Sequence, residues 1–187
     1  MKVATCIFMN MKPLLLIAAM LCFAFSFSQT ERVGNRNNSL TVDYQSNNVH
    51  QGLFEVGTVM HIKKSPALIR YVNFVIKANN YKDSIDFQIN IYSLKNGKPE
   101  VSLLKDPITV TSGMKKGVLT MDIGKYNIYV RDDFFLALKW KEGKDRERIG
   151  FGGGLSGNKS YQRIDNGEWD NLPMMNLGFY ADVLYPK

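Results

Sequence analysis

Cysteine is almost absent from this 187-residue chain. Its two cysteines, Cys6 and Cys22, both lie before residue 29, within a segment that we expect to be removed. The remaining chain has no disulfide, no thiolate metal site and no cysteine nucleophile. Histidine is equally scarce: His50 and His61 are the two imidazoles that can serve general base catalysis near neutral pH. We therefore expect no enzyme, no cofactor and no metal.

The N-terminus carries the one apolar run that is typical of export. Lys12 precedes an apolar stretch over residues 14–27, and the small residues Ser26 and Ser28 stand where a signal peptidase reads the chain. The stretch is too short and too closely followed by polar residues for a convincing membrane span. The pattern predicts a signal peptide over residues 1–28 and no stable membrane span after cleavage. The alternative is an uncleaved N-terminal anchor.

Other N-terminal residues bear on lipid attachment, on the true start of the chain and on the domain boundaries. Leu21 before Cys22 does not fit a lipid attachment site, and Met11 followed by lysine resembles a natural start. We expect residues 29–39, which are rich in asparagine, to be a flexible segment, and residues 40–187 to form a single domain. Such a protein is exported to the periplasm, the outer-membrane surface or the extracellular space.

The charge of the chain is mildly positive, with a formal net charge of +7. Lysines and arginines alternate with acids, as over residues 139–148, so the sequence does not indicate a nucleic-acid-binding face. A mild positive excess can favour anionic surfaces or polysaccharides.

Strict alternation of apolar and polar residues dominates the body of the chain. It is clearest over residues 85–92, IDFQINIY, and recurs over residues 54–62, 134–140 and 177–183. Residues 68–78 are apolar on both faces, which is typical of a central strand. No window shows a sustained helical period.

Turn signals separate these runs. Asn-Gly pairs occur at Asn96 and Asn166, and residues 111–117 contain two glycines. We count ten or eleven short strands. The sequence therefore predicts an all-β fold, an antiparallel β-sandwich that is jelly-roll-like.

Residues 152–160, GGGLSGNKS, are close to a phosphate-binding loop. Gly152 and Gly157 have the required spacing, but Asn158 stands where that loop needs lysine. A phosphate loop leads into a helix, whereas the residues after Gly157 alternate like a strand. The glycine spacing of a dinucleotide fingerprint fails for the same reason. We expect these glycines to end and bend a strand, and we expect no nucleotide ligand.

Several segments together resemble a known group of proteins. They are IYSLKNGKP (residues 91–99), GVLTMDIGKYNIYV (residues 117–130), DDFFLALKW (residues 132–140) and LGFYADV (residues 177–183). In this order they resemble the uncharacterised β-sandwich domains of secreted Bacteroidetes proteins, some of which lie behind a carboxypeptidase-regulatory-like domain. The leader ending SFSQ is similar to export signals of those bacteria. The resemblance implies an envelope or extracellular location and brings no catalytic residue with it.

Candidate catalytic or metal-binding groups are few. His50 lies in an expected loop, and His61 falls on the expected outer face of a strand, so both favour surface or structural roles. Adjacent aspartates on a strand point to opposite faces, so Asp132 and Asp133 do not form a catalytic pair of carboxylates. Glu168 and Asp170 lie in a segment that could hold calcium but is explained as a hairpin turn.

Aromatic residues give the remaining signal of a site. Sugar-binding sandwiches combine flat aromatic rings with polar hydrogen-bonding groups. The expected hairpin and the polar face of the 85–92 strand supply this combination in Tyr161, Arg163, Asp165, Asn166, Trp169 and Tyr92. The alternative is structural, because aromatic pairs also stabilise hairpins.

Two functions fit these observations. The first is a secreted, non-catalytic binding or adhesion module of the bacterial envelope whose partner is a glycan or an envelope protein. The second is a structural envelope component that has no small-molecule ligand.

Overall fold

The computed structural model describes residues 29–186 apart from residues 37, 46–51, 142–143 and 145. The predicted signal peptide over residues 1–28 and the candidate His50 lie outside the described residues. Within the described ranges, no helix has the length and apolar character needed to cross a membrane.

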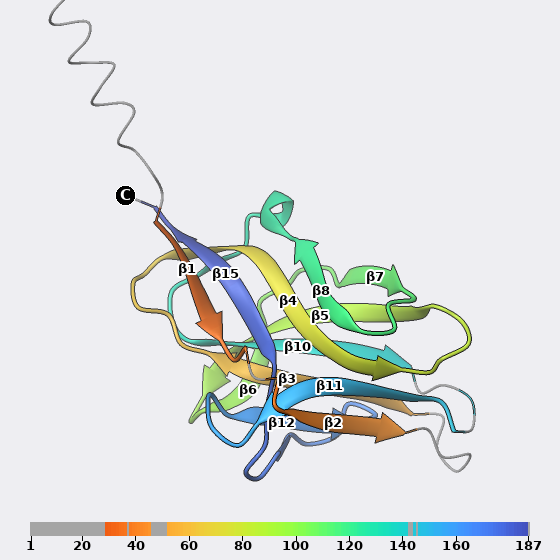
Figure 1. Ribbon diagram of the computed structural model, residues 1–187. Coiled ribbons are helices and arrows are strands. Elements are labelled where there is room, and N and C mark those ends of the chain that lie inside the picture. The colour runs from red at the N-terminus through yellow and green to blue at the C-terminus, as the bar shows by residue number, and fades with distance from the viewer. Residues whose placement is uncertain (1–28, 37, 46–51, 142–143, 145, 187) are drawn as a thin grey trace, which may run out of the picture.

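The strands form two antiparallel sheets that face each other (Figure 1). The first sheet contains β1 (Gln29–Gly34), β2 (Leu40–Gln45), β4 (Ala67–Asn79), β8 (Gly117–Asp122), β9 (Tyr129–Val130), β11 (Arg148–Gly154), β14 (Asn176–Leu177) and β15 (Phe179–Tyr185). The second contains β3 (Leu53–Met60), β5 (Ile85–Lys95), β6 (Lys98–Ser102), β7 (Ile108–Ser112), β10 (Phe134–Lys141), β12 (Ser160–Ile164) and β13 (Asp170–Asn171). A single 3₁₀ turn, η1 (Gly124–Tyr126), follows β8.

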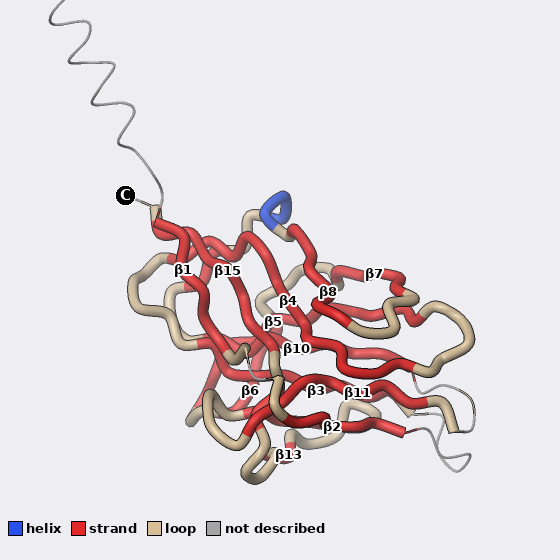
Figure 2. Tube along the Cα trace, viewed as in Figure 1, coloured by secondary structure: helices blue, strands red, loops and turns tan. Residues whose placement is uncertain are grey.

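The prediction of an all-β antiparallel sandwich is confirmed. Consecutive strands pass repeatedly from one sheet to the other, as they do in jelly-roll folds (Figure 2). The described residues form fifteen strands rather than the ten or eleven expected. The difference arises partly because β9, β13 and β14 are pairings of two residues each, which are too short to show an alternating pattern.

The central strand of the first sheet is β4, as its two apolar faces predicted. It pairs with β15 and β11 along one edge and with β8 and β9 along the other. The first segment of the described chain differs from expectation. Residues 29–39 were expected to be flexible, yet β1 pairs with β15 over its full length, and the start of β1 lies beside the C-terminus (Figure 1). Burial of Val33 and the Arg32–Asp182 ion pair of 2.6 Å help to hold it there.

Aromatic rings fill the space between the sheets. Trp140 on β10 lies at the centre, with its ring 5.6 Å from Phe54 and 5.5 Å from Phe151 between centroids. The inward residues of the 85–92 strand, Ile85, Phe87, Ile89 and Ile91, are all buried, as the alternation predicted. Apolar burial on this scale is the main term that stabilises such a fold.

The glycine-rich β11 pairs with β2 in an unbroken register and with β4 in an irregular one. The register with β4 shifts between Gly150 and Phe151, where Lys77 is the extra residue, so the β-bulge lies in β4. A side chain at Gly150 would come close to the side chains of Asp43 and Thr41 on the neighbouring β2, and these exposed side chains would have to shift to make room for it. After Gly157 the chain enters β12 rather than a helix, and the loop therefore lacks the helical N-terminus on which a phosphate cradle depends.

Tyr44 allows the stability cost of an unpaired hydroxyl in the core to be measured. Among the described residues its buried hydroxyl has no hydrogen-bond partner, and burial raises its pKa because the phenolate would lose its hydration. We expect Tyr44→Phe to stabilise the protein at neutral pH by about 1 kcal/mol, because it removes an unsatisfied buried group. Urea unfolding followed by circular dichroism measures this change. A loss of stability would show that the hydroxyl has a partner.

The same variant should change the response to alkali. Above the ordinary pKa of tyrosine, the unfolded chain releases the proton of Tyr44 while the folded chain retains it. The wild type then loses up to about 1.4 kcal/mol per pH unit from this residue. Because phenylalanine does not titrate, the advantage of Tyr44→Phe should grow above about pH 10.

Candidate functional site

The outer face of the second sheet carries an apolar cluster that is separate from the core. The outer-face cluster consists of Val59, Tyr92, Phe135, Ala137 and Tyr161, with Leu94 and Trp169 packed against it. The β12–β13 hairpin brings Trp169 over the sheet, where its ring lies 4.9 Å from that of Phe135. Edge-to-face contacts of this kind stabilise the aromatic packing. The outer face is thus partly covered by the protein itself.

A buried carboxylate lies beneath this cover. Glu55, on β3, is only 1% exposed. Its Oε1 accepts hydrogen bonds from Asn90 Nδ2 at 2.6 Å and Tyr92 Oη at 2.7 Å, and its Oε2 accepts one from Arg163 Nε at 2.8 Å. A buried charge is tolerated only when such partners replace its water. Burial, and then the neighbouring Glu55, raise the pKa of Tyr92.

The structure brings the six predicted site residues into one region, but gives most of them internal partners. Tyr92 and Tyr161 are only 8% and 5% exposed, so their rings do not offer the free faces that sugar stacking requires. Arg163 lies with its guanidinium carbon 4.3 Å from the centroid of Trp169, which is half-buried. Packing within the outer-face cluster is what removes these rings from solvent. The alternation of residues in β5 and β12 does not by itself predict that packing.

The tip of the hairpin also differs in detail from the sequence prediction. The tight turn centres on Asp165 and Asn166, with φ angles of 51° and 58°, rather than on the Asn166-Gly167 pair. Gly167 N donates to Ile164 O at 2.9 Å and closes that turn. Asp165 accepts a bond from Leu53 N, and Asn166 accepts one from Lys139 Nζ, both at 2.8 Å. Ligand binding by this hairpin stays a prediction that now rests on Trp169 and the exposed turn.

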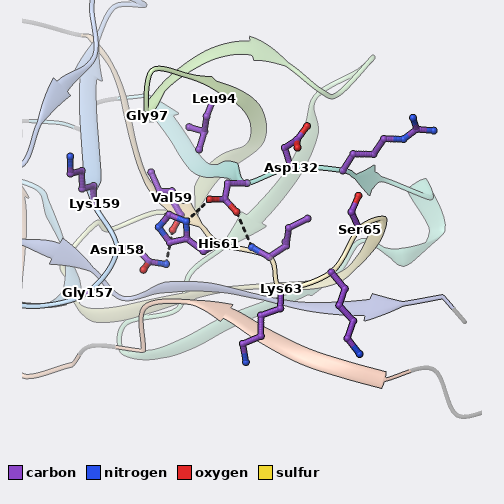
Figure 3. A pocket seen from close by; sticks show the side chains of 14 residues that line it. Val59, His61, Lys63, Ser65, Leu94, Gly97, Asp132, Gly157, Asn158 and Lys159 are labelled. Carbon is purple, nitrogen blue, oxygen red and sulfur yellow. Dashed lines mark hydrogen bonds and ion pairs between the residues drawn. The ribbon is translucent and has the colours of Figure 1, made fainter.

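A cleft of about 800 Å³ lies at the end of β3 (Figure 3). Four connections meet there: residues 61–65 after β3, residues 131–133 before β10, residues 157–159 before β12, and the β5–β6 turn at Gly97. Loops at the ends of strands are where sandwich folds place binding residues, because the sheets hold them without restricting their sequence. We call this the His61 cleft.

His61 and Asp133 form the centre of the cleft. His61 Nδ1 lies 2.5 Å from Asp133 Oδ2, and Ile62 N donates to Asp133 Oδ1 at 3.0 Å. The expectation placed His61 on the outer face of a strand, whereas β3 ends at Met60 and His61 begins the connection. Asp133 and Asp132 precede β10, as predicted for a polar strand entry. The sequence did not indicate that Asp133 would meet His61, which is 72 residues away.

The loop that resembled a phosphate loop forms one wall of the cleft. Asn158 donates from Nδ2 to Val59 O at 2.9 Å and from its backbone N to Asn35 Oδ1 at 2.7 Å. Asn35, which is buried, donates back to Asn158 O at 2.9 Å. These reciprocal bonds fix the loop beside His61 without a ligand. The sequence prediction gave this segment a geometric role only, and its bonding in the structure is not that of a phosphate loop.

Cations predominate around the rim. The lining contains Lys63, Lys64, Arg131 and Lys159 together with two carboxylates, Asp132 and Asp133. Lys63 pairs with Glu31, and Lys64 donates to Gln29 Oε1 at 3.1 Å. Within the described ranges, Arg131 and Lys159 form no ion pair, and both are exposed. The excess of positive charge favours an anionic group in the cleft.

Two further observations describe the chemistry of the cleft. A histidine–aspartate pair activates a side-chain nucleophile only when a hydroxyl or thiol lies within hydrogen-bond reach of the imidazole. In the described part of the chain, the hydrogen-bond partner of His61 is Asp133, and no hydroxyl is bonded to its ring. The described residues also contain no group of three or more histidine, cysteine, aspartate or glutamate side chains suited to a metal ion.

Comparisons with known proteins define the class of fold. No family model and no curated protein matches this sequence. Among solved structures, the chain is similar to the cysteine protease and lectin-like domains of Cwp84, a surface layer associated protein of Clostridium difficile. That match has 10% identity and a TM-score of 0.51, and it covers 79% of this chain but 36% of the other. A second Cwp84 structure, taken after propeptide cleavage, has 11% identity, a TM-score of 0.48 and coverages of 79% and 41%. The first likeness supports the fold alone.

The buried carboxylate yields a testable expectation. Glu55→Gln leaves Arg163 beside an uncharged amide, and breaking a buried pair in this way should lower the free energy of unfolding by about 3 kcal/mol. Glu100→Gln is the matched control, because Glu100 pairs with Lys95 at 2.7 Å in an exposed position. That control should change stability much less. Urea unfolding of both variants tests the difference, and equal effects would contradict a structural role for Glu55.

Proposed function

We propose that the protein is an exported, non-catalytic binding module of the bacterial envelope, and that an acidic glycan binds in its His61 cleft. The observation that carries the proposal is the meeting of four strand connections around a cleft with more cations than carboxylates. The volume of about 800 Å³ lies within the range of small-ligand sites. A site of this size takes a short stretch of a sugar chain.

Several properties of the lining favour a glycan. Sugar hydroxyls both donate and accept hydrogen bonds, and the cleft presents acceptors in Asp132 and Asp133 together with donors in Lys159 and Arg131. Leu94 and Ile62 add apolar surface for the carbon-bearing faces of sugar rings. The carboxylates suit neutral hydroxyls, and the surplus cations suit the carboxylate or sulfate of an acidic sugar. An acidic glycan uses both sets of groups.

Location and the absence of catalysis are parts of the same proposal. The apolar leader and the resemblance to secreted Bacteroidetes domains support export. The neighbour Cwp84 is a surface layer associated protein with a lectin-like domain, which agrees with a surface-binding role at the level of fold. The proposal includes no cysteine protease activity, since the two cysteines, Cys6 and Cys22, lie outside the described ranges.

Binding to polygalacturonate oligosaccharides tests the proposal. We expect saturable binding by isothermal titration calorimetry, weakening as salt rises because the rim cations are exposed and screened. The double variant Lys159→Ala/Arg131→Ala should bind roughly tenfold more weakly or worse. Its matched control is Lys116→Ala/Lys141→Ala, which removes the same charge at exposed positions outside the cleft.

The control separates site binding from attraction by net charge. Equal losses in the two double variants would mean that the glycan follows overall charge, and the cleft would then have no specific role. A flat response to acidic sugars in the wild-type protein, together with self-association in analytical ultracentrifugation, would favour the structural envelope component instead.

A further inference from the structure

A second groove lies away from the His61 cleft, between the β6–β7 connection and the segment that follows η1. Its volume is about 570 Å³, and residues 103–108 and 126–129 line it. Two tyrosines border it, Tyr126 and Tyr129, and they are 47% and 55% exposed. Among the large apolar and aromatic side chains exposed in the described residues, these are the two aromatic ones. Leu103 in the same groove is exposed as well.

The exposure of both rings follows from the local backbone. Ile123 and Ile128 are buried beside β4, and Ile69 N donates to Ile128 O at 3.0 Å. Asn127 adopts a left-handed conformation with φ of 51°, and its N donates to Gly124 O at 3.1 Å. With the isoleucines anchored in the core, Tyr126 and Tyr129 are left on the surface.

The opposite wall is also fixed in the absence of a ligand. Leu103 N donates to Ile91 O at 2.7 Å, which ties the connection to β5. Ser102 Oγ accepts from Leu104 N at 3.2 Å and stabilises the turn. Lys125 Nζ lies 5.1 Å from the centroid of the Tyr126 ring and helps to orient it. A groove with both walls held in place loses little conformational entropy on binding.

One of the two edge strands beside the groove, β6, disfavours a peptide strand as the occupant. β6 lies at an edge of the second sheet, where an added strand would pair with it. It contains Lys98, Pro99 and Glu100, and charged residues and proline on an edge strand oppose such pairing. The groove also holds hydrogen-bonding groups in Lys105, Asp106 and Asn127 beside the rings. Their two charges cancel, so the groove does not select a charged ligand.

We infer that this groove is a second glycan site, in which an uncharged chain of pyranose sugars stacks on Tyr126 and Tyr129. The apolar face of a pyranose ring matches the flat face of a tyrosine, and the hydroxyls at its edge match Asp106 and Asn127. The inference does not depend on the His61 cleft, which is lined by different residues and has a different charge.

Calorimetric titration with cellohexaose, xylohexaose and mannohexaose tests this inference on the chain that begins at Gln29. We expect at least one of these neutral sugars to bind, with little dependence on salt because no net charge is involved. Tyr126→Ala/Tyr129→Ala should weaken binding roughly tenfold or more, since two stacking surfaces are lost. Tyr126→Phe/Tyr129→Phe should retain most of the affinity, because the rings remain. Met174→Ala is the control for loss of an exposed apolar side chain elsewhere.

The outcomes separate this site from the His61 cleft and from a protein interface. Loss of neutral-sugar binding in Lys159→Ala/Arg131→Ala, with no change in the tyrosine variants, would assign the sugar to the cleft and overturn the inference. Absence of binding to all three hexasaccharides would overturn it as well. Self-association of the wild type that Tyr126→Ala/Tyr129→Ala abolishes, without sugar binding, would identify the groove as a contact between protein chains. Circular dichroism of each variant checks that the fold is intact.

Discussion

A β-strand sends alternate side chains to opposite faces, and this constraint governs the whole molecule. In β3, β5 and β10 one set of residues meets the first sheet and builds the aromatic core around Trp140. The other set must face outward, and here it includes Glu55 and large rings such as Tyr92 and Phe135. Apolar rings left in water are unfavourable, so the β12–β13 hairpin covers them and Arg163 neutralises the carboxylate below. The second sheet is therefore packed on both faces.

This arrangement affects where a ligand can bind. The cover removes Tyr92 and Tyr161 from solvent, and the hydrogen-bonding capacity of Arg163 is directed to Glu55 and Tyr92. Open hydrogen-bonding groups remain at the strand connections, where the His61 cleft lies, and beside β6 and η1, where Tyr126 and Tyr129 are exposed. The two regions differ in chemistry. One is polar with a positive rim, and the other combines aromatic rings with balanced charge.

The sequence predicted the strands well where a repeat of two residues was long enough to be seen. The inward stripe of β5 and the central position of β4 both follow from local pattern, because burial of a whole face leaves a regular trace. The bulge opposite Gly150 and Phe151 lies in β4, and the glycines of β11 did not predict it. The short pairings β13 and β14 could not be predicted, because two residues carry no period. β1 was missed because its residues are mostly exposed, and its place is decided by the edge of β15.

The candidate sites were harder to predict, for a physical reason. The alternation placed Tyr92 correctly on the outer face of its strand but could not show that Trp169 and Arg163 would cover it. The sequence prediction gave residues 152–160 a geometric role only, and it could not show that Asn35 fixes this loop or that His61 meets Asp133. Tyr126 and Tyr129 passed unnoticed, since their exposure depends on which neighbours enter the core.

By itself, the sequence determined the fold class, the principal strands and the side chains that those strands turn inward. These properties depend on residues close together in the chain, and the period of a strand records them directly. Only the tertiary structure decided which outward residues are covered and which distant loops converge. Those outcomes depend on contacts between segments that are far apart in the sequence, and no local pattern encodes them.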